Sequence, residues 1–192
     1  FVNIGGISNI TYLGKDEKII SLDTGPGNFL IDKILQLKSK NKIQYDKDGA
    51  IAFTGSVDKN ILESYLSDPY YEALPPKSLD VNDFSLSPVR SLQLEDAVAT
   101  LSDLTSLTII NALDFFKIKP NEIILCGGGR KNKYISKPFE SLSNILTTNI
   151  DKYKIDGDFI ESQAFAYLAI RSFLKKPISF PDTTGVLEPL SG

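Results

Sequence analysis

Two short glycine-rich turns within the first 28 residues constrain the fold of this chain most strongly. Apolar residues flank the first turn, residues 5–9 (GGISN), on both sides, which is typical of a strand, a tight turn and a second strand. A third apolar run, residues 18–22, stops at the second turn, residues 23–28 (DTGPGN). Apolar residues then recur at helical spacing from Phe29 to Leu37. The opening therefore predicts three strands and a helix, with a polar turn after the first strand and another after the third.

Both turns have a composition that suits an anion. Backbone N–H groups at a glycine turn form a concave set of donors, and the N-terminus of a helix adds a favourable dipole. Ser8, Asn9, Thr24 and Asn28 supply side-chain donors. Either turn alone is better explained as a plain connection between elements. Two such turns in one short unit favour a binding role.

The rest of the chain adds helices and two further strands. Helices are expected over residues 29–40, 56–66 with Ser56 as N-cap, 94–117 and 159–175, and a helical pattern also runs through Tyr134, Phe139 and Leu142. Strands are expected over residues 122–126 and 144–150. Residues 68–88 form a long connection rich in Pro, Tyr, Ser and Asp. This alternation of strands and helices predicts a single α/β domain.

A triple glycine, residues 127–129, follows the apolar run 122–126. Ligands of open α/β sheets commonly bind at the carboxyl ends of strands, so this turn is a candidate site. The Gly-x-Gly-x-x-Gly spacing of a dinucleotide site is not met. A plain strand-to-helix turn remains the alternative.

Composition excludes several classes of function. The formal net charge of −3 gives no electrostatic case for binding nucleic acid or an anionic membrane. No apolar run approaches the roughly 18 residues that span a bilayer. With no histidine and one cysteine, Cys126, a zinc or iron–sulfur site and an intrachain disulfide are not expected. The cysteine content fits a reducing compartment, and a cytoplasmic location is expected.

Two further motifs have more than one interpretation. Residues 46–49 (DKDG) can suggest a calcium loop, but the full ladder of ligands ending in a twelfth-position Glu is absent, so a turn is preferred. Lys77, in the sequence PPKS, could meet an anion, although a solvated lysine is the preferred interpretation.

Together the motifs resemble the anhydro-N-acetylmuramic acid kinase family, two-lobed ATPases of the actin, Hsp70 and sugar-kinase superfamily. The matching stretches, which run from the first residue to about residue 185, are residues 3–9, 23–28, 45–49, 75–78, 126–132, 156–161 and 164–169. The resemblance implies a ribonuclease-H-like α/β lobe, with a mixed sheet whose first three strands are antiparallel. It also implies that residues 1–192 are the C-terminal lobe of a longer protein. The phosphate loop of the family's N-terminal lobe (Gly-Thr-Ser-x-Asp-Gly) does not occur in the sequence, and the sequence contains no methionine.

The resemblance implies a function in peptidoglycan recycling. Family enzymes use ATP and water to open 1,6-anhydro-N-acetylmuramic acid, and they release N-acetylmuramic acid 6-phosphate and ADP. Carried onto this sequence, the phosphates would meet Gly5, Gly6, Ser8 and Asn9, and the nucleoside would meet Gly127, Gly128, Gly129 and Asn132. The sugar would meet Asp23, Thr24, Gly25, Asn28 and Glu161. Magnesium is expected with ATP, without metal ligands assigned in this chain, and homodimers are suggested.

Asp23 is the expected general base, and Glu161 is the next candidate. Each has a structural alternative: Asp23 can cap a turn through its own backbone, and a carboxylate such as Glu161 is favoured in the first turn of a helix. Two other functions stay open, namely another sugar or acyl kinase of the superfamily and a catalytically inactive lobe that binds nucleotide or a partner. The chain alone is expected to have little or no kinase activity.

Overall fold

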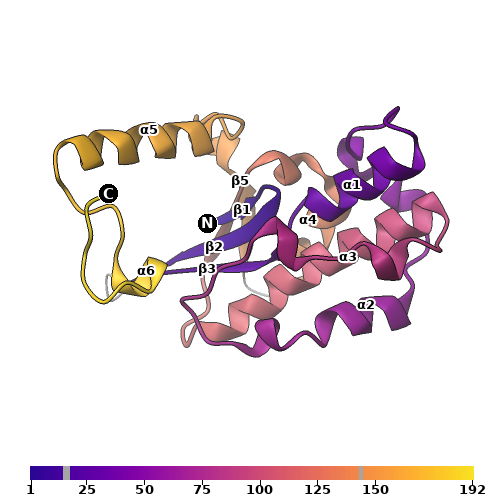
Figure 1. The fold of residues 1–192 in the computed structure, drawn as a ribbon, viewed down its shortest axis with the longest axis horizontal. Coiled ribbons are helices and arrows are strands. Elements are labelled where there is room, and N and C mark those ends of the chain that lie inside the picture. Colours follow the sequence, from indigo (N-terminus) through magenta and orange to yellow (C-terminus); the bar gives the residue numbers. More distant parts are fainter. Residues whose placement is uncertain (15–17, 143–144) are drawn as a thin grey trace.

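The computed structural model describes residues 1–14, 18–142 and 145–192, and it contains a five-stranded mixed sheet (Figure 1). The strands are β1 (Val2–Ile4), β2 (Ile7–Leu13), β3 (Ile19–Pro26), β4 (Glu122–Cys126) and β5 (Leu146–Asn149), in the order β3-β2-β1-β4-β5. β2 is antiparallel to both β1 and β3, whereas β4 is parallel to β1 and β5 is parallel to β4. This order and these directions are those of a ribonuclease-H-like sheet, so the predicted fold class is confirmed.

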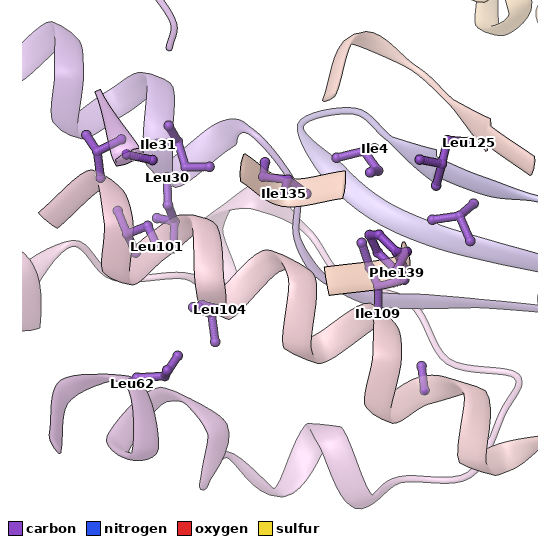
Figure 2. Close-up of a cluster of buried hydrophobic side chains, with 14 of the residues drawn as sticks. Ile4, Leu30, Ile31, Leu62, Leu101, Leu104, Ile109, Leu125, Ile135 and Phe139 are labelled. Carbon is purple, nitrogen blue, oxygen red and sulfur yellow. The ribbon is translucent and has the colours of Figure 1, made fainter. Parts of the chain in front are cut away.

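Four helices pack together beside the sheet and enclose the core: α1 (Phe29–Lys38), α2 (Lys59–Leu66), α3 (Leu94–Ala112) and α4 (Lys133–Glu140). Two more helices, α5 (Ile160–Phe173) and α6 (Pro181–Thr184), follow in the C-terminal part of the chain. α3 contacts α1, α2, α4, β2 and β3, and is the centre of the packing. Figure 2 shows the buried side chains that these elements share, among them Ile4, Leu30, Leu104 and Phe139. The amphipathic pattern of residues 94–117 thus belongs to the core, as the sequence predicted.

Several predicted boundaries need correction. The helix predicted from Ser56 begins at Lys59, because the side chain of Asp58 accepts a hydrogen bond from the N–H of Ile61 at 3.0 Å and caps it. Ser56 instead donates its N–H to Asp96, at 2.8 Å. α3 ends at Ala112 and a 3₁₀ turn follows it, so the helix does not reach residue 117. Asn144, at the start of the strand predicted over 144–150, lies outside the described residues.

The third strand is longer than predicted. Residues 23–26 were expected in a loop, but they continue β3, because Asp23, Gly25 and Pro26 pair with residues of β2. A bulge between Ser8 and Asn9 shifts the register and lets the pairing continue to Pro26. The second polar turn is therefore shortened to the connection between β3 and α1.

β3 is an edge strand, and the long segment 68–88 covers it at Asp23. The N–H of Asp23 donates to the carbonyl of Lys77 at 3.0 Å, and the Tyr70 hydroxyl donates to the carbonyl of Asp23 at 2.7 Å. The ammonium of Lys77 donates to the Tyr70 carbonyl at 2.8 Å and lies over the rings of Tyr70 and Phe115. The preferred interpretation of Lys77 as a solvated lysine is therefore wrong. Lys77 instead stabilises the segment 68–88, which covers the edge strand β3.

α5 lies away from the group formed by α1 to α4, together with α6 (Figure 1). None of its residues is buried, and Phe165, Tyr167, Ile170 and Phe173 are each more than half exposed. In the described part of the chain, no helix is long and apolar enough to cross a membrane.

Candidate functional site

Three turns meet at one edge of the sheet. β1 and β4 are parallel neighbours, so their carboxyl ends lie side by side, and each is followed by glycines, residues 5–6 and 127–129. Residues 27–28, which connect β3 to α1, join them there. The sequence predicted each of these turns, and the structure brings them together.

Asn28 ties the turns to one another. Its N–H donates to the carbonyl of Gly5 at 2.7 Å, and its side-chain amide donates to the carbonyl of Ile4 at 3.2 Å. The N–H of Gly27 donates to the carbonyl of Gly6 at 2.9 Å. The side chain of Asn28 makes no capping bond to α1, although Asn28 is the N-cap residue. Through these bonds the N-terminus of α1 lies directly beside the turn at Gly5 and Gly6, which follows β1.

Three glycines of these turns are required by the fold itself. A Cβ on Gly27 would collide with the carbonyl of Gly5, and one on Gly129 would lie 2.7 Å from the Cβ of Ile4. Gly127 has φ of 73°, in the left-handed region, and a Cβ there would lie 2.7 Å from the carbonyl oxygen of Ile4. Their presence needs no ligand to explain it.

Gly5, Gly6 and Gly128 are different, because the fold leaves space in front of them. The atom nearest to a Cβ built on each would lie at 3.5 Å, 3.9 Å and 4.0 Å, respectively. None of the three has a positive φ. These positions therefore offer backbone that something outside the chain can approach closely.

A cleft of about 530 Å³ opens beside Gly128. Four aspartates and two lysines give the lining its polar character. Besides Asn28 and Gly128, the residues that line the cleft are Ile31, Asp32, Tyr45, Asp46, Lys47, Asp48, Gly129, Lys131, Asn132 and Asp158. Asn132 is buried and caps α4, because its Oδ1 accepts the N–H groups of Tyr134 and Ile135 at 3.0 Å and 3.2 Å. The hydrogen bonds to α4 thus fix the position of Asn132 in the wall of the cleft.

The turn predicted at residues 46–49 is confirmed. Asp46 is buried, and its two carboxylate oxygens accept the N–H groups of Ile51 at 2.8 Å and Ala52 at 3.0 Å. Both oxygens are engaged in shaping the turn.

Asp32 should make the stability of the protein depend on pH. Burial, and secondarily the charge of Asp46, raise the pKa of Asp32 to about 6. Between about pH 4 and pH 6 the folded protein binds a proton that the unfolded chain releases, so stability falls as pH rises through this range. We expect Asp32→Asn to raise the free energy of unfolding by about 1–2 kcal/mol at pH 7, since solvent screens this half-buried carboxylate, and to leave it unchanged near pH 4. Urea unfolding at both pH values measures this.

The control for that measurement is the same change at an exposed aspartate, Asp182→Asn. It should leave the difference in unfolding free energy between pH 4 and pH 7 as in the wild type. An Asp32→Asn protein with the wild-type pH dependence would contradict the assignment.

The hydroxyls of Ser8 and Thr24 are buried and bond to each other at 2.7 Å. Ser8 also donates to the carbonyl of Gly25 at 3.1 Å. A Cβ on Gly25 would lie 2.7 Å from the hydroxyl oxygen of Thr108, so Gly25 is needed for close packing of β3 on α3. The predicted binding roles of these three residues stay predictions, and the hydroxyls themselves are engaged within the fold.

A row of polar side chains crosses the face of the sheet that points away from the buried core. Asn3 pairs with Asn9, and Asn9 pairs with Asp23, so the three side chains point to the same side of β1, β2 and β3. All three are partly exposed, whereas Ile4 and Ile10, their neighbours in alternation, are buried. Asn3 was not predicted as a site residue, although the alternation of buried and polar positions in β1 is a signal that could have found it.

Asp23 stands at the end of this row. Its Oδ2 accepts the N–H of Leu79 at 2.8 Å, and no described residue donates to its Oδ1. Burial raises the pKa of Asp23, and the Leu79 N–H partly offsets this increase. The arrangement is suited to a general base, because one oxygen orients the carboxylate and the other is available to a proton.

Glu161 lies across from the row. A cavity of about 360 Å³ brings Asn3 and Asn9 of the sheet together with Glu161 and Ala164 of α5. Glu161 itself is exposed, in the first turn of α5. The structure therefore brings Glu161 to Asn9, while Asp23 lies one strand further along, outside the lining of this cavity.

Comparison with known proteins identifies relatives along the full length of the chain. The family model for anhydro-N-acetylmuramic acid kinase matches residues 1–191. The anhydro-N-acetylmuramic acid kinase of Zymomonas mobilis is 42% identical over 192 residues, which cover 100% of this chain and 52% of the relative. The corresponding kinase of Caulobacter vibrioides is 42% identical over 191 residues, covering 100% and 51%. The chain thus spans about half the length of the curated relatives it matches.

A solved structure is also similar. It is the activator of 2-hydroxyisocaproyl-CoA dehydratase from Clostridium difficile with bound ADPNP, at 14% identity and a TM-score of 0.45, covering 77% of this chain and 52% of that one.

Proposed function

Because the chain belongs to the anhydro-N-acetylmuramic acid kinase family, we propose that it is the C-terminal lobe of a kinase of peptidoglycan recycling. With ATP and water, the enzyme would convert 1,6-anhydro-N-acetylmuramic acid into N-acetylmuramic acid 6-phosphate and ADP. The observation that carries the proposal is the meeting of three turns at one sheet edge, with open backbone at Gly5, Gly6 and Gly128. Such a corner suits phosphate and nucleoside.

In this proposal ATP lies along that corner. Its β- and γ-phosphates lie at Gly5, Gly6, Ser8 and Asn9, next to the N-terminus of α1. The nucleoside lies in the cleft of about 530 Å³ bordered by the triple glycine and Asn132. The hydrogen bond between the hydroxyls of Ser8 and Thr24 favours contacts of ATP with the backbone of Ser8.

The sugar lies on the face that carries Asp23, with Asn28 and Glu161 beside it. Thr24 and Gly25 would meet it through their backbone, because the Thr24 hydroxyl is buried and bonded to Ser8. Water attacks the anomeric carbon, the bond from that carbon to O6 breaks, and the released O6 takes the γ-phosphoryl group. Asp23 accepts the proton of the water as general base. The hydrogen bond from Leu79 to Oδ2 supports this role, because it leaves Oδ1 for the proton.

Phosphoryl transfer also needs neutralisation of charge, normally by magnesium. Within residues 1–14, 18–142 and 145–192, no group of three or more His, Cys, Asp or Glu side chains is arranged to hold a metal ion. Magnesium that is bound with a nucleotide needs only one or two protein carboxylates besides the phosphates and waters, so we assign it no cluster of ligands in this chain. In our proposal magnesium arrives with ATP, and its protein contacts come from the other lobe.

The other lobe is the main partner that we propose. The relatives are about twice as long as this chain, and α5 exposes large apolar side chains along its whole length. A second lobe that packs near α5 would enclose Glu161 and the polar row of the sheet. A homodimer and a cytoplasmic location belong to the same proposal, by analogy with the family.

The chain alone is expected to have little or no kinase activity, because closure of two lobes assembles such sites. ADP release from ATP and the anhydro sugar, compared between the chain and the two-lobed protein, measures this. Circular dichroism of the chain shows in parallel whether it is folded. Robust turnover by the folded chain would contradict the proposed architecture.

The reaction itself is tested with the two-lobed protein in H₂¹⁸O. Mass spectrometry at early times should find the product sugar phosphate with ¹⁸O at the anomeric carbon, because water opens the bridge there. Unlabelled product kept in H₂¹⁸O for the same time should stay largely unlabelled, since a reducing sugar exchanges this oxygen with water only slowly. N-acetylglucosamine, which has no bridge, is the control and should not be phosphorylated. Phosphorylation of a different sugar or acyl substrate would favour another kinase of the superfamily, and nucleotide binding without any transfer would favour an inactive lobe.

A further inference from the structure

The guanidinium of Arg130 joins three segments of the chain in the interior. Its side chain is 2% exposed. Nε and Nη2 donate to the two carboxylate oxygens of Asp151, at 2.8 Å and 3.2 Å. Nη1 donates to Asp158 at 2.7 Å and to the carbonyl of Gly127 at 2.9 Å. Four of the five guanidinium N–H groups are thus bonded, in a fork that a lysine ammonium cannot reproduce.

The segment before α5 is shaped to receive this guanidinium. A Cβ on Gly157 would lie 2.5 Å from the Nε of Arg130, so only glycine leaves room for the side chain at this position. The N–H of Gly157 donates to Asp151 at 3.1 Å and closes the network. Gly157 and Asp158 are therefore explained by Arg130, whereas Asp156 accepts the N–H of Asp158 at 2.9 Å.

Arg130 does not line the cleft beside Gly128, but two of its partners connect it to that cleft. Gly127 directly precedes Gly128 and has a left-handed φ, so its carbonyl direction determines the path of the glycine turn. Asp158 lines the cleft and also accepts the ammonium of Lys131 at 2.6 Å. Arg130 thus binds residues at one wall of the cleft, although it does not line the cleft itself.

We propose that Arg130 is a positioning residue for the nucleotide, which fixes the glycine turn and the carboxylate of Asp158 relative to each other. The proposal rests on the proposed function, since it explains how that nucleotide site is held. The same bonds attach the glycine turn to the residues that precede α5, where Glu161 lies. Asp158 lines the nucleotide cleft and Gly127 directly precedes the glycines that line it, whereas Asp23 is not part of the network. Loss of the network should therefore weaken nucleotide binding and leave the chemistry at Asp23 largely unchanged.

The test compares Arg130→Lys with the wild type in the two-lobed protein. The Kd for ADP and the KM for ATP should rise by about 10–100-fold, the range expected for lost hydrogen bonds to a charged group. The kcat at saturating ATP should change by less than about 3-fold, because no group at the reacting atoms is altered. Asp158→Asn should act in the same direction, and the double variant should show less than the product of the two effects, since both break one network.

Arg90→Lys is the matched control, because Arg90 is exposed and its side chain lies outside the network. It should leave Kd, KM and kcat unchanged. A folded Arg130→Lys protein that binds ADP like the wild type, or one that loses only thermal stability, would overturn the proposal. If Arg130→Lys does not fold, Asp158→Asn decides, and unchanged ADP affinity there would overturn it too. A wild-type protein that binds no ADP would contradict the proposed function itself, and this inference with it.

Discussion

Replacing Asp23 with asparagine is expected to lower turnover of the two-lobed protein by about 10²–10⁴-fold, the usual cost of a lost general base. Asparagine keeps the size of the side chain, and its carbonyl oxygen can still accept the N–H of Leu79. The amide cannot take a proton from the attacking water. Binding of ATP should be unchanged, because the change leaves the glycine turns intact.

The pH profile separates a catalytic role from a structural one. Burial raises the pKa of Asp23, so wild-type turnover should be lost as pH falls through that raised pKa and the carboxylate is protonated. The residual turnover of Asp23→Asn should lack this acid limb. Asp114→Asn, at an aspartate whose side chain is 85% exposed, should keep both the rate and the limb. If Asp23→Asn turned over at nearly the normal rate, the base would have to be another group, and Glu161→Gln would be the next variant to measure.

Replacing Gly128 with valine should raise the Kd for nucleotide by about 10–100-fold, in line with the usual cost of overpacking a fitted site. The atom nearest to a Cβ at Gly128 is the Nδ2 of Asn28, at 4.0 Å, and Gly128 does not have a positive φ. The protein should therefore fold normally, with the new side chain in the cleft where the nucleoside is proposed. Binding of the anhydro sugar should be largely retained. Calorimetric titration with each ligand measures both affinities.

Gly129→Val is the informative contrast, because its Cβ would lie 2.7 Å from the Cβ of Ile4. It should destabilise the fold and reduce both affinities together. Ala73→Val, at an exposed position outside the cleft, should change neither. Equal loss of nucleotide and sugar binding in a folded Gly128→Val protein would contradict the assignment of this cleft to the nucleoside.

Much of the fold could be predicted because each strand and helix has its own periodicity. Residues 122–126 form β4 with the boundaries expected from their apolar run, and the pattern of residues 94–117 corresponds to α3, five residues too long. Boundaries failed where a distant partner decides them. β3, for example, continues through Asp23 because β2 pairs with it. The start of α2 was missed for a local reason, since Asp58 rather than Ser56 caps the helix.

The candidate site was predicted in parts. The sequence located the two glycine turns and the triple glycine, yet it could not separate Gly128, which faces open space, from Gly127 and Gly129, which the packing requires. That distinction depends on Ile4, more than 100 residues away in the sequence. Asp23 was expected at the end of a strand, whereas it lies within an edge strand and is held by Tyr70 and Leu79.

The sequence by itself determined the α/β class, the polar turns and the family to which the chain belongs. These depend on local patterns, in which each residue is read against its close neighbours. Only the tertiary structure decided which turns meet at Asn28, which face carries Asn3, Asn9 and Asp23, and which side chains Arg130 binds. Contacts of this kind arise from strand register and helix packing between residues far apart in the chain, and no local pattern contains that information.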